Sequence, residues 1–176
     1  QVVVEGAGIF GKQRIAPISV QYANAHTPYG PIISKDQCLK YFTLRAKWDP
    51  GAKYLPGSRD KLIKGNQRSK LIADLPSEKR ENRLSRKGPK LEKIIPEEPD
   101  RLAAWRLCLG PRQEASSINP AKSGGQYLVV SEGAMLHRGS ALPRFSVMFV
   151  TEDEVALRII AGEDGLDLLI LQFPVR

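Results

Sequence analysis

The chain has 176 residues, of which 41% are hydrophobic and 7% aromatic, and its formal net charge is +8 at pH 7. This length and apolar content suit one domain with a real hydrophobic core. No apolar run approaches the ~18–20 residues that span a bilayer, so the sequence excludes a membrane helix. We therefore expect a cytoplasmic protein that has no membrane partner.

The positive charge is concentrated in the middle of the chain. Residues 1–57 carry a net +4, residues 58–93 a net +7 and residues 94–176 a net −3. A basic total therefore does not predict a basic surface everywhere, and the middle segment is the place to look for anionic partners.

The N-terminal part is typical of short strands. The segment 18–25 alternates loosely, and 41–48 alternates almost without fault, with Phe42, Leu44, Ala46 and Trp48 on one predicted face. Such alternation predicts a half-buried strand, which ends at the Asp-Pro-Gly turn of 49–51. Glycines at positions 6, 8 and 11 fit a GxGxxG pattern, but no helical pattern follows them, so dinucleotide binding is not favoured.

Residues 58–100 differ in character, since they are charged, poor in aromatic residues and interrupted by prolines. We interpret them as a long basic insertion, either a solvated connection or a functional segment. A short strand is expected at 69–74. A helix over 77–87 would have only Leu84 on its apolar face.

The strand pattern returns after residue 100. We expect strands at 102–110 and 126–133, a hairpin over 134–143 with its turn at Arg138-Gly139, and a buried strand at 145–150. The segment 156–174 reads as two strands joined by a Gly-Glu-Asp-Gly turn. Many short strands with almost no helical periodicity predict an all-β barrel or sandwich.

Three motifs in this region resemble the cupin superfamily: QYLVVSEG (126–133), GSALPRFS (139–146) and LRIIAGEDGLDLLILQFP (157–174). The resemblance implies a double-stranded β-helix, or jelly-roll barrel. It would form a single domain over 1–176, with N-terminal strands and the basic insertion. It also implies a homodimer that pairs through an exposed strand edge.

The resemblance also shows which ligands of the family's metal site are missing. Gln126 stands where the family's first motif has its glutamate, the loop 117–125 contains no histidine, and Met148 stands near the place of the second motif's histidine. A neutral amide and a thioether are poor ligands for a hard or borderline divalent ion. We therefore expect no metal and no cofactor.

Alternation places Gln126, Leu128 and Val130 on one face, and Met148 with its i±2 neighbours on the facing strand. These residues either line an apolar ligand pocket anchored by Gln126 or simply fill the core. Trp48 joins the ligand-binding candidates if its strand completes the barrel.

Other candidates are scattered. Arg158, inside an apolar strand, either points outward or anchors an anionic group of a ligand. His26 and His137 are weak acid–base candidates, and a histidine beside a turn is more often a surface residue. Cys38 and Cys108 are expected to be two buried thiols rather than a disulfide.

Two functions remain open at this level. The first is a metal-free barrel that binds a small organic molecule and acts as a non-redox isomerase, cyclase or lyase through shape and acid–base effects. The second is a non-catalytic binding or structural module whose basic insertion makes nonspecific contacts with polyanions.

Overall fold

The computed structural model describes residues 1–35, 38–65 and 67–175. Strands account for 44% of the residues and helices for 5%, so the predicted all-β fold is confirmed. The sequence predicts a single domain, whereas the structure groups the chain into two compact units, unit 1 (Gln1–Pro76) and unit 2 (Ser77–Arg176). The predicted insertion 58–100 is therefore divided between two units.

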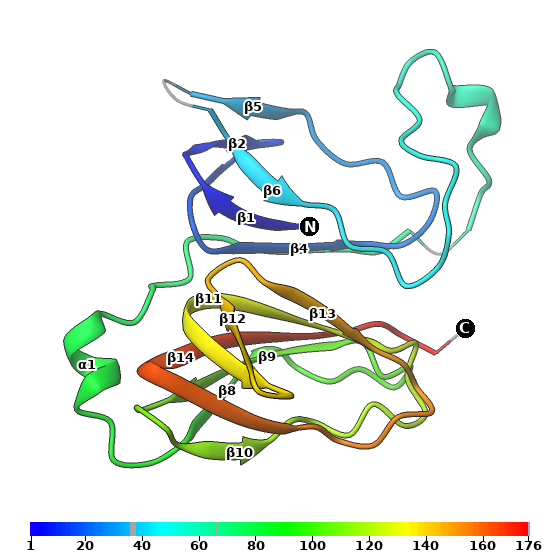
Figure 1. Cartoon of the computed structure of the whole chain (residues 1–176). Helices are drawn as coiled ribbons and strands as arrows, with labels where there is room; N and C mark the ends of the chain where they lie inside the picture. The colour runs from blue at the N-terminus through cyan, green and yellow to red at the C-terminus, as the bar shows by residue number, and fades with distance from the viewer. Residues whose placement is uncertain (36–37, 66, 176) are drawn as a thin grey trace. The chain divides into compact units, whose positions relative to one another are not determined.

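Unit 1 consists of two small antiparallel sheets (Figure 1). The first has the order β6 (Lys40–Phe42), β1 (Val2–Glu5), β4 (Ser19–Ala23) and β7 (Ser69–Ile72). The second has the order β3 (Gln13–Ile15), β2 (Gly8–Phe10) and β5 (Ile32–Ser34). Between β6 and β7 the chain makes a long excursion, whose described part contains one short 3-10 helix, η1 (Arg59–Lys61).

The strand predicted at 41–48 is shorter in the structure. Phe42, Leu44 and Ala46 are half-buried as the alternation predicts, but regular pairing ends at Phe42. The last residue of β6 that pairs with β1 is Phe42, which lies opposite Val2. Trp48 is therefore 88% exposed, and its placement on a buried strand face was wrong.

The glycine-rich segment near the N-terminus forms strand and turn. Gly8 lies in β2, and Gly11 lies in the tight connection to β3, so no helix follows the glycines. A Cβ on Gly8 would lie 2.4 Å from the backbone oxygen of Ile33 on β5. The glycine thus permits two strands to approach closely and has no need of a nucleotide to explain it.

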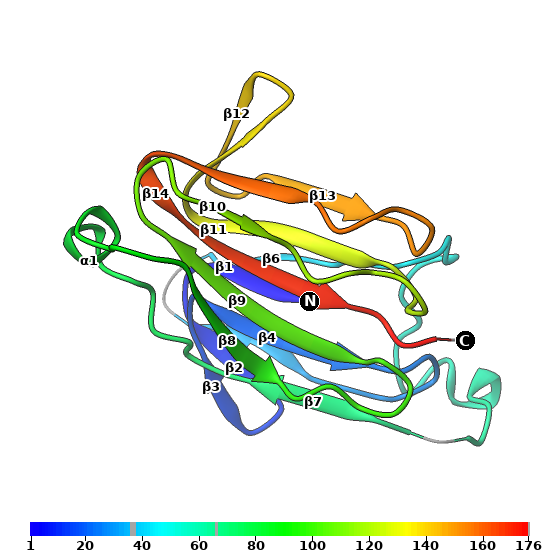
Figure 2. The same ribbon diagram turned by 90° about the horizontal axis from the view of Figure 1, so that it is seen from below.

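Unit 2 is built on one seven-stranded antiparallel sheet (Figure 2). Its main path runs β12 (Ser140–Pro143), β11 (Gln126–His137), β14 (Arg158–Gln172), β9 (Ala103–Leu109) and β8 (Lys90–Ile95). In addition, β10 (Glu114–Ser116) pairs with β14, and β13 (Val147–Val150) pairs with β11. The strands predicted at 102–110 and 145–150 are thus present, as is the hairpin turn, where Arg138 and Gly139 both have positive φ.

The turn predicted at 162–165 is instead a bulge. Gly133 pairs with Leu166 and Met135 pairs with Ala161, so β11 and β14 each continue past the irregularity. The Gly-Glu-Asp-Gly segment of 162–165 bulges out of β14 without reversing the chain. Gly133 has φ +74°, and a Cβ there would lie 2.1 Å from the oxygen of Gly165. The glycines therefore serve a close approach at a bend of the strand pair, which sequence patterns do not separate from a hairpin turn.

The core of unit 2 lies on one face of this sheet. Its buried members come from alternate positions of the neighbouring strands: Ala103, Trp105, Leu107, Leu109, Leu128, Val130, Met135, Val150, Ile159, Ala161, Leu166, Leu168 and Ile170. Each is at most 3% exposed. Residues two apart in a strand share a face, so the pairing register alone gathers them.

The helix expected over 77–87 is a single turn, α1 (Arg80–Leu84). Leu84, expected to be its apolar contact, is 40% exposed, whereas Arg83 is 5% exposed. The Arg83 guanidinium donates from Nη1 to the oxygen of Glu78 at 2.6 Å and from Nε to the oxygen of Asp164 at 3.3 Å. The bond from Arg83 to the Asp164 oxygen and the ion pair between Arg80 and Asp164, rather than an apolar stripe, hold this turn against β14.

Candidate functional site

The predicted interior face of unit 2 exists. Gln126 lies opposite Val150 on β13 and Gln172 on β14, and Leu128 lies opposite Met148. Gln126 is 0% exposed and Leu128 is 1% exposed, while Met148 is half-buried against the core. The alternation thus predicted correctly that Gln126 and Leu128 share one face of β11.

A short chain of amides crosses the interior face. Gln126 Nε2 donates to Gln172 Oε1 at 2.8 Å, and Gln172 Nε2 donates to the backbone oxygen of Arg101 at 2.6 Å. Gln126 Oε1 is buried and has no hydrogen-bond partner among the described residues. A buried acceptor without a partner costs free energy, so a hydrogen-bond donor placed against this oxygen would be stabilised.

The rest of the face is closely filled. Trp105, Leu168 and Ile170 are at most 3% exposed and pack in the same cluster as Leu128. Of the two alternatives, a lined pocket and a filled core, this packing favours the filled core.

The remaining sequence candidates are dispersed. Arg158 points outward and forms a forked ion pair with the exposed Glu114 of β10, from Nε to Oε2 at 2.9 Å and from Nη2 to Oε1 at 2.7 Å. His137 is half-buried at the last position of β11. In unit 1, His26 Nδ1 accepts the backbone N–H of Ile63 at 3.4 Å. Neither histidine is placed beside a carboxylate or a nucleophile by any contact among the described residues.

Sequence reasoning missed a buried charged cluster on the opposite face of β9 and β14. Arg106 Nε donates to Asp167 Oδ1 at 2.8 Å, and Arg106 Nη2 pairs with Asp167 Oδ2. Their exposed fractions are 8% and 1%. The hydrogen bond to Asp167 raises the pKa of Arg106 above its ordinary value. The sequence signal for this cluster was a single charged residue within each of two apolar strands, Arg106 in WRLCL and Asp167 in LDLL.

Cys108 belongs to this cluster. Its Sγ lies 3.9 Å from Asp167 Oδ1, and burial, followed by the charge of Asp167, raises the pKa of the thiol to about 12. Such a thiol stays protonated and unreactive. Cys38, by contrast, is exposed, so the prediction that both thiols are buried was wrong for Cys38; both cysteines are free.

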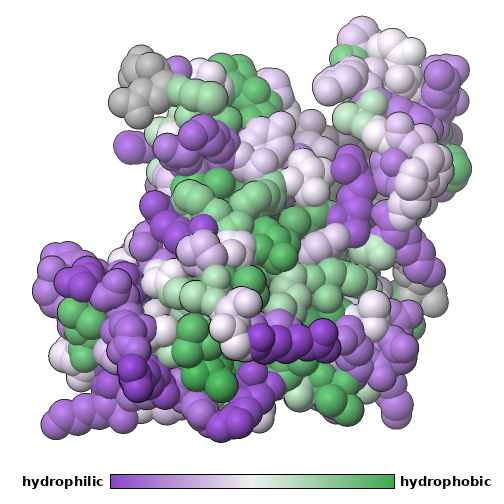
Figure 3. All heavy atoms as spheres, viewed as in Figure 1, coloured by the Kyte–Doolittle hydropathy of each residue, from purple (hydrophilic) through white to green (hydrophobic). Residues whose placement is uncertain are grey.

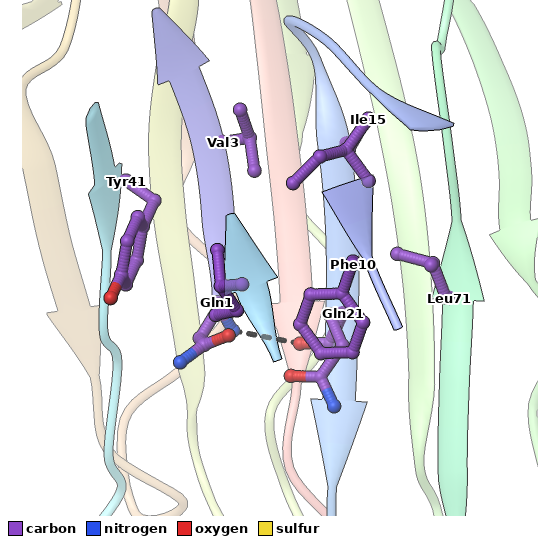
Figure 4. Close-up of a pocket in the computed structure, with 9 residues that line it drawn as sticks. Gln1, Val3, Phe10, Ile15, Gln21, Tyr41 and Leu71 are labelled. Atoms are coloured by element: carbon purple, nitrogen blue, oxygen red, sulfur yellow. Dashed lines mark hydrogen bonds between the residues drawn. The ribbon is translucent and has the colours of Figure 1, made fainter. Parts of the chain in front are cut away.

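A small cavity lies between the two sheets of unit 1 (Figure 4). Val3, Gln21 and Leu71 line it from the first sheet, and Phe10 and Ile15 from the second, while the Gln1 amino group donates to the Gln21 oxygen at 2.7 Å. Its volume of about 10 Å³ holds roughly one water molecule. This space is too small for an organic ligand.

Residues 43–68 form the long excursion between β6 and β7, which we call the basic loop. It carries seven Lys or Arg and two Asp residues. Five of these cations are exposed and take part in no ion pair among the residues that the structure describes: Lys47, Lys53, Arg59, Lys61 and Lys64. Figure 1 shows the loop leaving the strands of unit 1, and in Figure 3 purple, pale and green atoms lie side by side on it.

The basic loop is attached to the end of β4. The backbone N–H of Asn24 donates to the oxygen of Arg68 at 2.9 Å, and the backbone N–H of Arg68 donates to Thr27 Oγ1 at 3.2 Å. The guanidinium of Arg68 lies 5.4 Å from the centre of the Tyr22 ring. With the His26 contact to Ile63, these bonds fix where the loop returns to the sheet.

Within the described residues, no three His, Cys, Asp or Glu side chains lie close enough together to hold a metal ion. Nor does any described helix have the length and apolarity to cross a membrane.

No family model and no curated protein matches this sequence. Among solved structures, the chain is similar to a Cupin_2 domain of an XRE family transcriptional regulator from Enterobacter cloacae. The identity is 15% and the TM-score 0.39, over 51% of this chain and 100% of that one. A cupin domain, the family that the sequence motifs resemble, is thus among the structures to which this chain is similar.

A second solved structure, a protein of unknown function from Rhizobium leguminosarum bv. viciae, is similar over 57% of this chain and 99% of its own length. Its identity is 11% and its TM-score 0.39.

Proposed function

We propose that this protein is a non-catalytic binding module that contacts polyanions through the basic loop. The observation that carries the proposal is the set of five exposed cations between Lys47 and Lys64, none of which has an acidic partner among the described residues. The charge of unit 1 supports it, since this unit holds twelve Lys or Arg against five Asp or Glu residues.

The physical basis is the release of counterions. A polyanion holds a condensed layer of cations, and each lysine or arginine that replaces one of them returns it to solution. Binding of this kind needs no pocket and no precise geometry, which suits an exposed loop. It also makes a quantitative demand, because affinity must fall as salt rises.

The experiment measures binding of the full chain to a fluorescein-labelled linear polyphosphate by fluorescence anisotropy, between about 50 and about 200 mM KCl. If all five cations engage, the logarithm of the binding constant should fall with the logarithm of salt with a slope of roughly −3.5, about 0.7 per cation. The variant Lys61→Gln/Lys64→Gln should lower the magnitude of this slope by about 1.4.

A matched control removes the same charge from unit 2. Lys122 and Arg138 are exposed and take part in no recorded ion pair among the described residues, so Lys122→Gln/Arg138→Gln changes the net charge equally. We expect this variant to keep the wild-type slope. Equal losses in both variants would assign the binding to net charge rather than to the basic loop, and binding that ignores salt would reject the proposal.

A second candidate function is binding of a small organic molecule at the interior face of unit 2. The observation that favours it is Gln126 Oε1, which is buried and lacks a partner among the described residues. Native mass spectrometry of gently purified protein tests it. The candidate predicts a bound molecule of constant mass that Gln126→Leu removes, and a bare chain in the wild type argues for the filled core.

A further inference from the structure

Two aromatic side chains of the basic loop lie almost entirely in solvent. Trp48 is 88% exposed and Tyr54 is 79% exposed. Rings of this size are usually withdrawn from water, because burying their apolar surface is favourable. Two such rings on one loop therefore mark a surface suited to contact with a partner.

Each ring directly follows a lysine. Lys47 precedes Trp48, and Lys53 precedes Tyr54, so the same pair of residue types recurs six positions later. Both lysines are exposed and lie outside every ion pair recorded for the described residues. A cation next to a flat aromatic ring is the combination with which proteins bind single strands, since the cation takes a phosphate and the ring takes a base.

Local hydrogen bonds order the backbone beside both rings. The N–H of Ser58 donates to the oxygen of Tyr54 at 3.0 Å, and the N–H of Gly51 donates to Asp49 Oδ1 at 2.7 Å. The same Asp49 oxygen lies 3.4 Å from Arg45 Nε, which compensates the negative charge beside Trp48. Turns that are already formed reduce the entropy lost when the rings engage a ligand.

From these contacts we infer that the polyanion bound by the basic loop is a single-stranded nucleic acid, whose bases stack on Trp48 and Tyr54. This inference rests on the polyanion binding proposed above and names its partner. Stacking is tolerant of sequence because every base presents a flat face, so we expect little preference among sequences. A duplex hides those faces and should gain nothing from the rings.

An anionic membrane is the main competitor, since Trp, Tyr and Lys also gather at lipid headgroups. Leu55 and Ile63 of the same loop are 48% and 64% exposed. However, Lys47 and Asp49 flank Trp48 and Lys53 precedes Tyr54, so the rings alternate with charged residues, whereas a membrane-binding surface presents a continuous apolar face. The alternation of ring and cation therefore favours the nucleic acid.

The test uses the full chain and fluorescein-labelled single strands of about twelve nucleotides, one of uridine RNA and one of thymidine DNA. At about 100 mM salt, Trp48→Leu and Tyr54→Leu should each weaken binding about 5- to 100-fold. Trp48→Phe and Tyr54→Phe keep a ring and should restore most of the affinity. Weaker binding of the leucine variants to either strand supports the inference. The strand whose binding weakens more shows whether the partner is RNA or DNA.

Polyphosphate and a duplex of equal length are the controls. All four ring variants should bind both as the wild type does, which shows that the lysines remain in place. If the leucine variants bind single strands as tightly as the wild type while polyphosphate binding persists, this inference fails and the polyanion function stands. If polyphosphate does not bind either, the proposed function itself fails.

A further arm uses vesicles of phosphatidylcholine and phosphatidylserine. If the leucine substitutions abolish vesicle binding but leave single-strand binding unchanged, the partner is a membrane and the inference is overturned. Vesicle binding that does not depend on the rings, together with single-strand binding that does, supports the inference.

Discussion

The two units differ in where they place their charge and their apolar surface. Unit 1 has a net charge of +7, strands of three to five residues, and a Trp and a Tyr in solvent. Unit 2 has a net charge of +1, strands of up to 15 residues, and a core of thirteen buried side chains. Long paired strands gather an alternating face into one core, whereas short strands leave more of the chain in loops. The exposed basic loop therefore lies in the less regular unit.

The largest effect on stability is expected at the buried ion pair of unit 2, Arg106 and Asp167. Asp167→Ala leaves the buried Arg106 guanidinium without its carboxylate and should lower the free energy of unfolding by about 3–5 kcal/mol. Urea unfolding followed by Trp105 fluorescence in a Trp48→Phe background measures this, because Trp105 is then the one tryptophan and is 3% exposed in the folded state.

Two variants sharpen that measurement. Glu114→Gln breaks the exposed pair with Arg158 and should cost less than about 1 kcal/mol. The double variant Arg106→Met/Asp167→Leu removes both buried charges and should recover most of the stability that Asp167→Ala loses. A cost for Glu114→Gln as large as that for Asp167→Ala would contradict the assigned burial.

The bulge of β11 and β14 gives the next largest effect. Gly133→Ala combines a positive φ with a Cβ placed against the Gly165 oxygen, so we expect a loss of about 2–4 kcal/mol. Gly139→Ala has a similar φ but open space around it, and should cost about 1 kcal/mol. Thermal unfolding of the two variants compares them, and equal costs would mean that the close approach at Gly133 is absent.

The two thiols should differ in reactivity, one in each unit. Cys38 is exposed and should react with iodoacetamide at pH 8. Cys108 should react on the order of 100-fold more slowly, because its raised pKa lowers the fraction of thiolate and its burial limits access of the reagent. Mass spectrometry of timed samples gives both rates. Rapid modification of both sites in the folded protein would show that the Cys108 cluster is open.

The same thiol makes unit 2 sensitive to alkali. Because the folded-state pKa of Cys108 is raised from 9.0 to about 12, the unfolded chain releases its proton first. The contribution of the protonated Cys108 thiol to the free energy of unfolding is complete below pH 9 and is lost as the pH rises toward 12. The variant Cys108→Ala should flatten this decline in urea unfolding followed over that range, and an unchanged decline would assign it to other groups.

Much of unit 2 could be predicted from the sequence, and for a physical reason. Alternation assigned Gln126 and Leu128 to one strand face and Met148 to a face of the facing strand, and the structure pairs Leu128 with Met148. What alternation cannot give is the partner strand. It placed Trp48 on a buried face, although regular pairing with β1 ends at Phe42. It also interpreted the glycines of 162–165 as a turn, although the same residues permit a bulge.

The candidate site was harder to predict because it depends on exposure. The basic segment 58–100 was recognised from its charge and from its scarcity of aromatic residues. The rings lie just before it, at Trp48 and Tyr54, and became candidates only when the structure showed them in solvent. The repeated pair of lysine and aromatic residue was the sequence signal that could have found them.

Amide chemical-shift mapping tests the division between the units most directly. The full chain, labelled with ¹⁵N, is titrated with the single-stranded oligonucleotide at low salt, and the shift of each backbone amide is recorded. Binding through the basic loop predicts that the largest shifts fall within residues 43–68, around Trp48 and Tyr54, and that the amide signals of β9, β11 and β14 do not move. Shifts centred on Gln126 and the interior face of unit 2, with the basic loop unchanged, would contradict it.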